Sequence, residues 1–241
     1  MLNVVSLTKS YPDGQNRTVV LKDVDFSLQH QDFTVVMGKS GSGKSTLLFC
    51  VSLLDAIDNG EITFSGTRLD RLNENQLAKI RLNEFGFVFQ NNNLIEMMTL
   101  FENVALPAIE QRSFDKQKVT SIMVALGLEE CLHKIPSLCS SGEKQRCAIA
   151  RALVNKPKIL FADEPTGALD YHNTITLMET LKKLNEEGQT ILVVSHDRLV
   201  ASYAKKVIYL KDGKLVEGIA FTDESHEDRL RMIDDLIIKL D

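Results

Sequence analysis

Short apolar runs and turn residues predict two strands at the start of the chain. Residues 2–7 and 19–28 are rich in β-favouring side chains, and the PDGQN segment at 12–16 consists of turn formers. The apolar run 33–37 is typical of a strand buried on both faces of a parallel sheet. A glycine-rich loop and a helical pattern at 45–54 follow it directly. The pattern therefore predicts two strands joined by a turn and then a strand–loop–helix unit.

Helical periodicity dominates the middle of the chain, from about residue 94 to 155. Before this region, short apolar runs predict further strands at 61–64 and 85–89. Within it, apolar residues recur with a helical period between 119 and 126, and another helix is predicted at 147–153. The middle of the chain is therefore interpreted as an inserted helical subdomain.

Strand signals return at 158–162 and 190–194, with a helical run at 174–185 between them. The strand predicted at 207–210 leads into an Asp-Gly turn at 212–213 and a further apolar pair, which indicates a hairpin. Alternating strands and helices predict an α/β domain with a largely parallel sheet.

The tail, residues 222–241, has seven acidic and three basic side chains and so carries most of the net charge of −5. Leu230, Ile233, Ile237 and Leu240 are spaced to form one face of a helix. Two interpretations stay open, a helix packed on its own domain and a helix that contacts a partner.

The composition is that of a soluble globular protein, with 44% hydrophobic and 25% charged residues among 241. With 28 lysines and arginines against 33 aspartates and glutamates, the chain lacks the basic surface that nucleic-acid binding requires. The longest apolar runs are five residues, far short of a membrane span, and no secretion signal opens the chain. The four cysteines form no CxxC pair, which indicates reduced thiols. We therefore expect a cytoplasmic protein that does not bind nucleic acid.

A phosphate-binding loop is the strongest chemical signal in the sequence. The run GKSGSGKS at 38–45 matches GxxxxGK[ST] and lies between a buried strand and a helix. Its glycines let backbone N–H groups surround phosphate oxygens, and the helix N-terminus adds partial positive charge. Lys44 would reach the β- and γ-phosphates, and the Ser45 hydroxyl would bind Mg²⁺. The predicted ATP contacts are Gly38, Lys39, Ser40, Gly41, Ser42, Gly43, Lys44, Ser45 and Thr46.

Two adjacent carboxylates follow a second apolar strand, in the run ILFADE at 159–164. The C-terminal ends of the strands are where open α/β sheets bind their ligands. Asp163 is therefore the candidate Mg²⁺ ligand, and Glu164 is placed to orient or deprotonate an attacking water.

The segment CSSGEKQR at 139–146 opens the helix that ends near Leu153. Ser140 with Glu143 three residues later forms a capping-box pattern, but a helix N-terminus of this kind is also an anion site. The segment resembles the signature motif of ABC transporter ATPases, LSGGQ or LSGGE followed by QR and an alanine-rich helix. The resemblance implies that Ser140 and Gly142 contact the γ-phosphate bound by a second subunit.

Further marks of this family occur in the expected order. By resemblance, Tyr11 stacks on adenine, and Gln90 senses Mg²⁺ and the attacking water and borders a groove that faces the transporter. The loop that ends at Asp170 resembles the one that crosses to the partner subunit, and His196 resembles the histidine that contacts the γ-phosphate. These resemblances cover about residues 2–220.

The family resemblance implies a particular α/β architecture. It is a P-loop NTPase core with a mainly parallel sheet, an N-terminal antiparallel β subdomain and an inserted α-helical subdomain at about 94–155. Residues 1–221 would form the ATPase domain, and residues 222–241 an acidic amphipathic C-terminal helix. The segment 162–170 is similar to the lipoprotein-releasing, macrolide-exporter and antimicrobial-peptide-resistance group.

The resemblance also implies a mechanism and partners. ATP and Mg²⁺ would bind between two nucleotide-binding subunits, expected to be a homodimer, and hydrolysis would release them. An integral membrane permease would use this motion for export, extraction or resistance, with the ATPase held on the inner face of the plasma membrane. One departure stands out, because Cys139 replaces the usual leucine and Ser141 the first glycine. Ser140 and Gly142 keep the serine hydroxyl and the second glycine, so we expect the γ-phosphate contact to survive, weakened by the Ser141 side chain.

Two other classes of protein fit the sequence less well than this hypothesis. A soluble ABC-type ATPase without a permease usually carries coiled-coil insertions, zinc modules or tandem cassettes, and the sequence shows a single cassette without them. A P-loop kinase for a small substrate would explain neither the signature helix nor His196.

Overall fold

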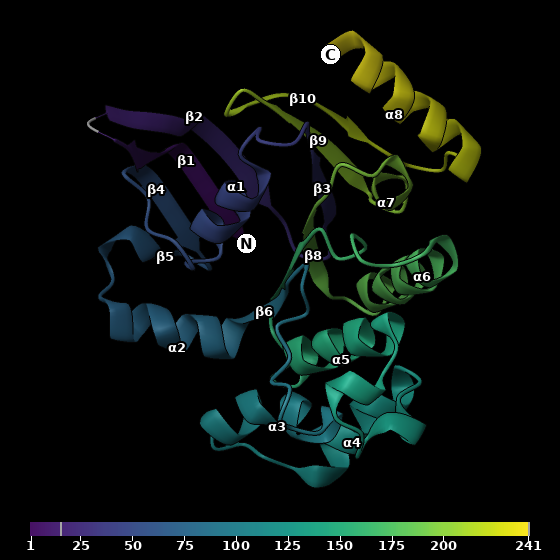
Figure 1. Ribbon diagram of the computed structural model, residues 1–241. Helices are drawn as coiled ribbons and strands as arrows, with labels where there is room; N and C mark the ends of the chain where they lie inside the picture. The colour runs from purple at the N-terminus through teal and green to yellow at the C-terminus, as the bar shows by residue number, and fades with distance from the viewer. Residues whose placement is uncertain (15, 241) are drawn as a thin grey trace.

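The computed structural model describes residues 1–14 and 16–240, which form two β-sheets with helices around them (Figure 1). The smaller sheet has the order β2-β1-β4-β5 and is antiparallel throughout. Its strands are β1 (Leu2–Asp13), β2 (Asn16–Leu28), β4 (Asn59–Phe64) and β5 (Thr67–Arg68). This sheet is the N-terminal antiparallel β subdomain that the family resemblance implies.

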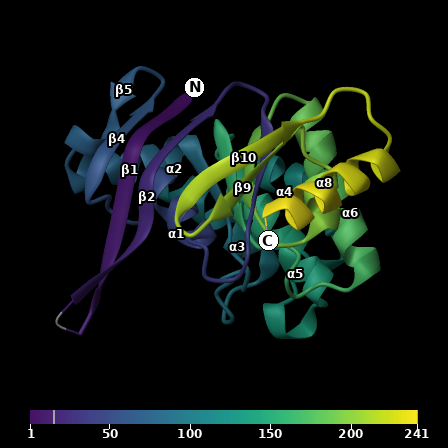
Figure 2. The same cartoon turned by 90° about the horizontal axis from the view of Figure 1, so that it is seen from above.

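The hairpin of β1 and β2 is longer than the hydrophobic pattern predicts. Pairing continues from Ser10 opposite Val19 to Asp13 opposite Asn16, so most of the turn predicted at 12–16 belongs to the strands. Its residue Gln15 lies outside the described residues. Figure 2 shows this end of the hairpin extending away from the body. Its side chains are mostly exposed there, so no apolar alternation marks the strands in the sequence.

The larger sheet has the order β10-β9-β3-β8-β7-β6, and all its neighbours are parallel except β10 and β9. Its strands are β3 (Phe33–Met37), β6 (Phe85–Val88), β7 (Ile159–Asp163), β8 (Thr190–Val194), β9 (Lys206–Lys211) and β10 (Lys214–Ala220). Every residue of β3, β7 and β8 is buried, which explains their unbroken apolar runs. The predicted parallel sheet is confirmed.

The helices of the middle segment form a group beside the large sheet (Figure 1). The α-helices are α1 (Lys44–Val51), α2 (Glu74–Glu84), α3 (Leu100–Glu110), α4 (Lys116–Ala125), α5 (Ser141–Leu153), α6 (Tyr171–Glu186), α7 (Arg198–Ser202) and α8 (His226–Leu240). Short 3-10 helices lie at Leu69–Arg71, Glu129–Cys131 and Pro136–Leu138. The hydrophobic pattern does not predict α2, because none of its side chains is fully buried and only Leu77 and Ile80 pack partly against the core.

The large sheet has a hydrophobic core on each face. Val36 of β3 points to the core shared with the small sheet and α1, whereas Val35 and Met37 point to the core shared with α3–α8. The same alternation holds along β7, where Phe161 and Leu160 lie on opposite sides. Burial on both faces fixes the strand register, since a slip of one residue would exchange the two faces.

Helix α8 lies against the helical side of the large sheet and packs on α7 (Figures 1 and 2). Ile233 and Leu236 are buried in the core there, and the partly buried Ile237 and Leu240 flank them. The helix begins at His226, four residues later than the tail segment that the sequence assigned to it, and Asp241 lies outside the described residues.

None of the helices in the described part of the chain is long and apolar enough to cross a membrane.

Candidate functional site

The parallel strands bring the predicted chemical groups to one edge of the sheet. Val36 of β3 pairs with Val194 of β8, and Val194 pairs with Asp163 of β7. The phosphate loop follows β3, the Asp163–Glu164 pair ends β7, and His196 follows β8. The Ser45–Asp163 contact joins residues 118 apart in the chain and the Glu164–His196 contact residues 32 apart, and the strand register makes them neighbours.

The phosphate loop adopts backbone conformations that favour glycine. Gly41 has φ of 79° and Gly43 has φ of 105°, both in the left-handed region. At Gly38, an added Cβ would lie only 2.3 Å from the carbonyl oxygen of Leu210. Gly43 is also the N-cap of α1 and has no side chain to satisfy the first N–H groups of that helix. Those N–H groups therefore stay available for an anion.

Lys44 is held inside the loop. Its Nζ donates hydrogen bonds to the carbonyl oxygens of Gly38, at 2.8 Å, and Lys39, at 3.1 Å. The same atom lies 3.9 Å from Oε1 of Glu164. Burial lowers the pKa of Lys44, and the neighbouring carboxylates Glu164 and Asp163 oppose this shift. A buried cation with two acidic neighbours marks the place where negative phosphate charge would be neutralised.

Ser45 and Asp163 form a pair at the base of the loop. The Ser45 hydroxyl donates to Oδ1 of Asp163 at 2.8 Å. Burial raises the pKa of the Asp163 carboxyl, and the charge of Glu164 raises it further, while Ser45 and Lys44 act in the opposite direction. A hydroxyl and a carboxylate side by side supply hard oxygen ligands of the kind that Mg²⁺ prefers.

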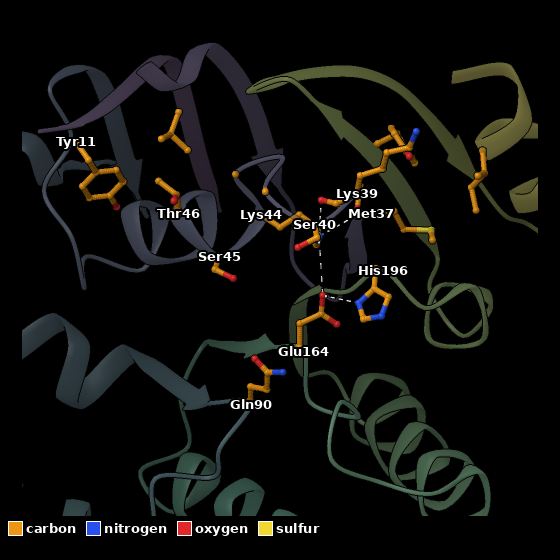
Figure 3. Close-up of a pocket in the computed structure, with 16 residues that line it drawn as sticks. Tyr11, Met37, Lys39, Ser40, Lys44, Ser45, Thr46, Gln90, Glu164 and His196 are labelled. Atoms are coloured by element: carbon orange, nitrogen blue, oxygen red, sulfur yellow. Dashed lines mark hydrogen bonds and ion pairs between the residues drawn. The ribbon is translucent and has the colours of Figure 1, made fainter. Parts of the chain in front are cut away.

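Glu164 has the most constrained carboxylate of the site. Its backbone is left-handed, with φ of 44°, and its N–H donates to the carbonyl oxygen of Val194 at 2.9 Å. Ser195 Oγ donates to Oε2 at 3.1 Å, and His196 Nδ1 lies 2.9 Å from Oε1 (Figure 3). A non-glycine residue in this conformation stores strain that the surrounding contacts must hold. Sequence reasoning did not identify Ser195 as part of this site.

Gln90 approaches Glu164 from the end of β6. Its amide points toward Glu164 and Ser45 in Figure 3. A Cβ added to Gly167 would lie 3.1 Å from Nε2 of Gln90, so the loop after Glu164 passes close to this side chain.

Tyr11 lies at the opposite end of the site from His196 (Figure 3). It comes from β1 of the small sheet, and its hydroxyl donates to Oδ2 of Asp55 at 2.6 Å. Burial and the hydrogen bond to Asp55 raise the pKa of Tyr11 to about 12. The phenol is therefore protonated at neutral pH.

One pocket of about 860 Å³ joins these groups. The sequence-predicted residues that line it are Tyr11, Gly38, Lys39, Ser40, Gly41, Gly43, Lys44, Ser45, Thr46, Gln90, Glu164 and His196. Four lining residues were not identified from the sequence, namely Val20, Met37, Tyr209 and Ile237. The amphipathic spacing of the tail is the signal that pointed to Ile237, but it does not tell which surface the helix covers.

The remaining predicted residues do not line this pocket. Ser42 turns into its own loop, and Ser140 and Gly142 lie at the start of α5. Ser140 accepts from the N–H of Glu143 at 3.2 Å, and the Ser140 N–H donates back to Glu143 at 2.6 Å, so the predicted capping box is present. Asp170 is the N-cap of α6, and the side chain of Asn173 covers Gly142.

A phosphate loop follows a buried strand, and a serine–aspartate pair and a glutamate held by its neighbours lie at the same sheet edge. This arrangement is that of a P-loop NTPase. The family model of the ABC transporter matches residues 21–167, so the chain belongs to the ABC transporter family.

Two named relatives and one solved structure are similar to this chain. The bacitracin export ATP-binding protein BceA of Halalkalibacterium halodurans is 40% identical over 94% of this chain and 91% of its own length. The macrolide export ATP-binding/permease protein MacB of Aggregatibacter actinomycetemcomitans is 41% identical over 90% of this chain. The chain spans only about a third of MacB, 34% of its length.

The solved structure is that of the dimeric ABC transporter cassette MJ0796. It has a TM-score of 0.86 and 38% identity, covering 93% of this chain and 100% of the cassette. A second structure of that cassette shows a post-hydrolysis state bound to ADP and Pi. The chain is accordingly an ABC-type ATPase, the ATP-binding subunit of an ABC transporter.

Proposed function

We propose that this subunit drives export, using ATP-driven closure of two copies to move a separate membrane permease that expels or extracts an amphiphilic compound or peptide. The export names of BceA and MacB support this direction. The observation that carries the catalytic part is the position of Glu164, which Ser195 and His196 hold beside Lys44 in the pocket of the phosphate loop.

The site residues fit ATP with Mg²⁺. Ser42 Oγ is buried in the phosphate loop without a hydrogen-bond partner, and the loop backbone approaches too closely at Gly38 for a side chain. Ser45 and Asp163 supply two oxygen ligands, and Gln90 stands near them. Ser45 and Asp163 would hold Mg²⁺ there, and the metal would supply positive charge against the phosphates. Mg²⁺ commonly takes few protein ligands beside phosphate and water, which a serine–aspartate pair matches.

The proposed roles follow from geometry and charge. Lys44 would exchange its carbonyl partners for the β- and γ-phosphates, since its ammonium already faces the pocket. Glu164 would accept a proton from the attacking water, or orient it. His196 would contact the γ-phosphate, and Gln90 would sense Mg²⁺ and the attacking water. Tyr11, at the other end of the same pocket, would stack on adenine.

The second copy would complete each site. Ser140 and Gly142 lie outside the pocket of their own chain, and the similar cassette is dimeric. We infer that the signature helix α5 of one copy faces the γ-phosphate bound by the other, with the Asp170 loop alongside. The γ-phosphate charge would then hold the two surfaces together, and its loss would release them.

A groove of about 410 Å³ between β6, α2 and α5 is the proposed permease contact. Arg151 of α5 lines it and donates to the carbonyl oxygens of Asn92 and Asn93, both at 2.6 Å. These bonds connect the segment after Gln90 to the signature helix α5. A permease segment bound in the groove would therefore contact or displace both the Gln90 segment and α5. This contact would hold the ATPase on the inner face of the plasma membrane, with residues 1–221 as the motor domain and 222–241 as an added C-terminal helix.

Replacing Glu164 with glutamine tests the catalytic assignment. Glu164→Gln keeps the shape of the side chain but removes the base, so we expect ATP hydrolysis to fall at least about 100-fold, within the range of general-base effects. With hydrolysis blocked, ATP should convert the variant to a stable dimer, measured by size-exclusion chromatography with light scattering. ATPase activity near the wild-type level would refute the role of Glu164. To test the permease, ATPase activity is measured in proteoliposomes with a membrane subunit that co-purifies with this chain, and absence of stimulation would count against the coupling.

A further inference from the structure

A partly buried lysine–aspartate pair lies directly behind Tyr11. Lys9 Nζ donates to Oδ1 of Asp55 at 2.7 Å and to the carbonyl oxygen of Ala56 at 2.5 Å. The other carboxylate oxygen, Oδ2, accepts the Tyr11 hydroxyl at 2.6 Å. Asp55 therefore joins β1 to the segment after α1 through both of its oxygens. The Lys9 side chain is 8% exposed and the Asp55 side chain 31% exposed, so water reaches this contact from the Asp55 side only.

The same lysine also stands over the ring of Tyr11. Its Nζ lies 4.9 Å from the ring centroid, within the range of a cation–π contact. The hydroxyl is thus fixed by Asp55 while the ring is fixed by Lys9. Two contacts at different points of one aromatic side chain restrict its rotation and its tilt, and Tyr11 still lines the nucleotide pocket.

The charges favour a permanent arrangement. Burial works against ionisation of Asp55, yet the hydrogen bonds from Lys9 and Tyr11 keep the pKa of its carboxyl below the usual value. The pKa of Tyr11 is raised to about 12, first by burial and then by Asp55. At neutral pH the phenol remains a donor and the carboxylate an acceptor, so the hydrogen bond persists.

We propose that Lys9 and Asp55 are positioning residues. They set the plane of the Tyr11 ring before the nucleotide binds, so that the ring is ready to stack on the purine base. This inference rests on the proposed function, in which Tyr11 stacks on adenine. A ring already held in place loses less conformational entropy when the base binds, and so contributes more of its stacking energy to affinity.

A neighbouring pair provides a matched control. Asp58, three residues after Asp55, also ties this segment to β1, because its Oδ2 accepts from the N–H of Ser10 at 2.7 Å and from the Ser10 hydroxyl at 2.6 Å. Arg17 donates to Asp58 as well. If Asp55 only fastened the segment to β1, Asp55→Ala and Asp58→Ala would have the same effect on ADP affinity. If Asp55 holds Tyr11, only Asp55→Ala should lower that affinity.

The test compares two ligands that differ by the adenosine group. Calorimetric titrations with Mg²⁺ measure the affinity of the full chain for ADP and for inorganic pyrophosphate, which has no base to stack and causes no hydrolysis. Because base stacking on an aromatic ring is worth about 1–3 kcal/mol, we expect Asp55→Ala and Lys9→Met to weaken ADP binding about five- to tenfold. Pyrophosphate affinity should stay within about twofold, since the phosphate loop is untouched, and Asp58→Ala should change neither.

The outcomes separate this inference from the proposed function. Equal losses for ADP and pyrophosphate, or the same ADP loss in Asp58→Ala, would overturn the positioning role. If Tyr11→Ala weakens ADP binding while Asp55→Ala and Lys9→Met do not, only the positioning role fails. If Tyr11→Ala leaves ADP affinity unchanged, the assignment of Tyr11 to adenine fails first. Intact pyrophosphate binding shows that a variant is folded. If Asp55→Ala is not folded, Lys9→Met alone tests the positioning role.

Discussion

Glu164 shows how a single residue depends on its neighbours for its chemistry. Its φ of 44° is uncommon for a residue with a side chain, and it directs the carboxylate to Ser195, His196 and Lys44 at once. The motif order of the sequence predicts Glu164 and His196, but not the contact between them. That contact exists because β7 and β8 are adjacent and in register, which a linear motif does not encode.

Ser141 is the residue at which the signature motif departs from its family. It is the first residue of α5, partly exposed and next to Ser140, so its side chain would face a partner copy. We expect Ser141→Gly to strengthen ATP-driven dimerisation about threefold, because glycine permits a closer backbone approach. The measurement is the protein concentration at half-dimerisation with ATP, in the Glu164→Gln background.

Ser137→Gly is the control for this change. It is the same substitution at an exposed residue just before the motif. An equal dimerisation constant for Ser141→Gly and its unsubstituted parent would contradict a weakening effect of Ser141.

At the scale of elements, burial decides what the sequence predicts. The strands β3, β7 and β8 are buried along their whole length and were predicted to within one residue of their observed ends. Helix α2 has no fully buried side chain, and its strongest local signal is the capping box of Asn73 and Gln76. The roles of Asp55 and Lys9 were not predicted either, because their contact joins residues 46 apart in the chain. Spacing along the chain does not reveal such a contact.

Helix α8 offers a stability test at the same scale. Ile233 is fully buried against the large core, so we expect Ile233→Ala to lower the free energy of unfolding by about 2–5 kcal/mol. Ile238 lies on the other side of the helix and is 77% exposed, so Ile238→Ala should cost less than about 0.5 kcal/mol.

Urea denaturation followed by circular dichroism measures both changes. Similar losses for the two variants would mean that α8 does not pack on its own domain in solution.

At the scale of the whole molecule, the predicted nucleotide contacts lie in two separate parts of the chain. The pocket gathers the phosphate loop, Glu164 and His196, while Ser140 and Gly142 lie apart at the start of α5. The two parts come from different regions of the fold, the sheet edge and the helical segment. Their separation is what the proposed dimer explains.

Mixing two inactive variants tests whether the sites are shared. Lys44→Ala disables the phosphate loop, and Ser140→Arg disables the signature helix. In the proposed dimer, each site pairs the phosphate loop of one copy with the signature helix of the other. One site of a mixed dimer therefore carries both substitutions and the other carries neither, so ATPase activity should return on mixing. If half of the dimers are mixed and each holds one intact site, we expect about a quarter of the wild-type rate.

The single variants, assayed at the same total concentration, are the controls for the mixing experiment. No recovery on mixing, together with normal hydrolysis by Ser140→Arg alone, would show that each copy holds a complete site.

Ile237 gives α8 a further experimental use. This residue is part of the pocket wall, and the neighbouring Ile238 points into solvent. A cysteine introduced at position 238 and labelled with an environment-sensitive dye would therefore place a reporter on the exposed side of a helix that lines the pocket, without altering the phosphate loop. The terminal helix, whose charge first set it apart from the body of the chain, is thus the natural attachment point for an optical readout of each ATPase cycle.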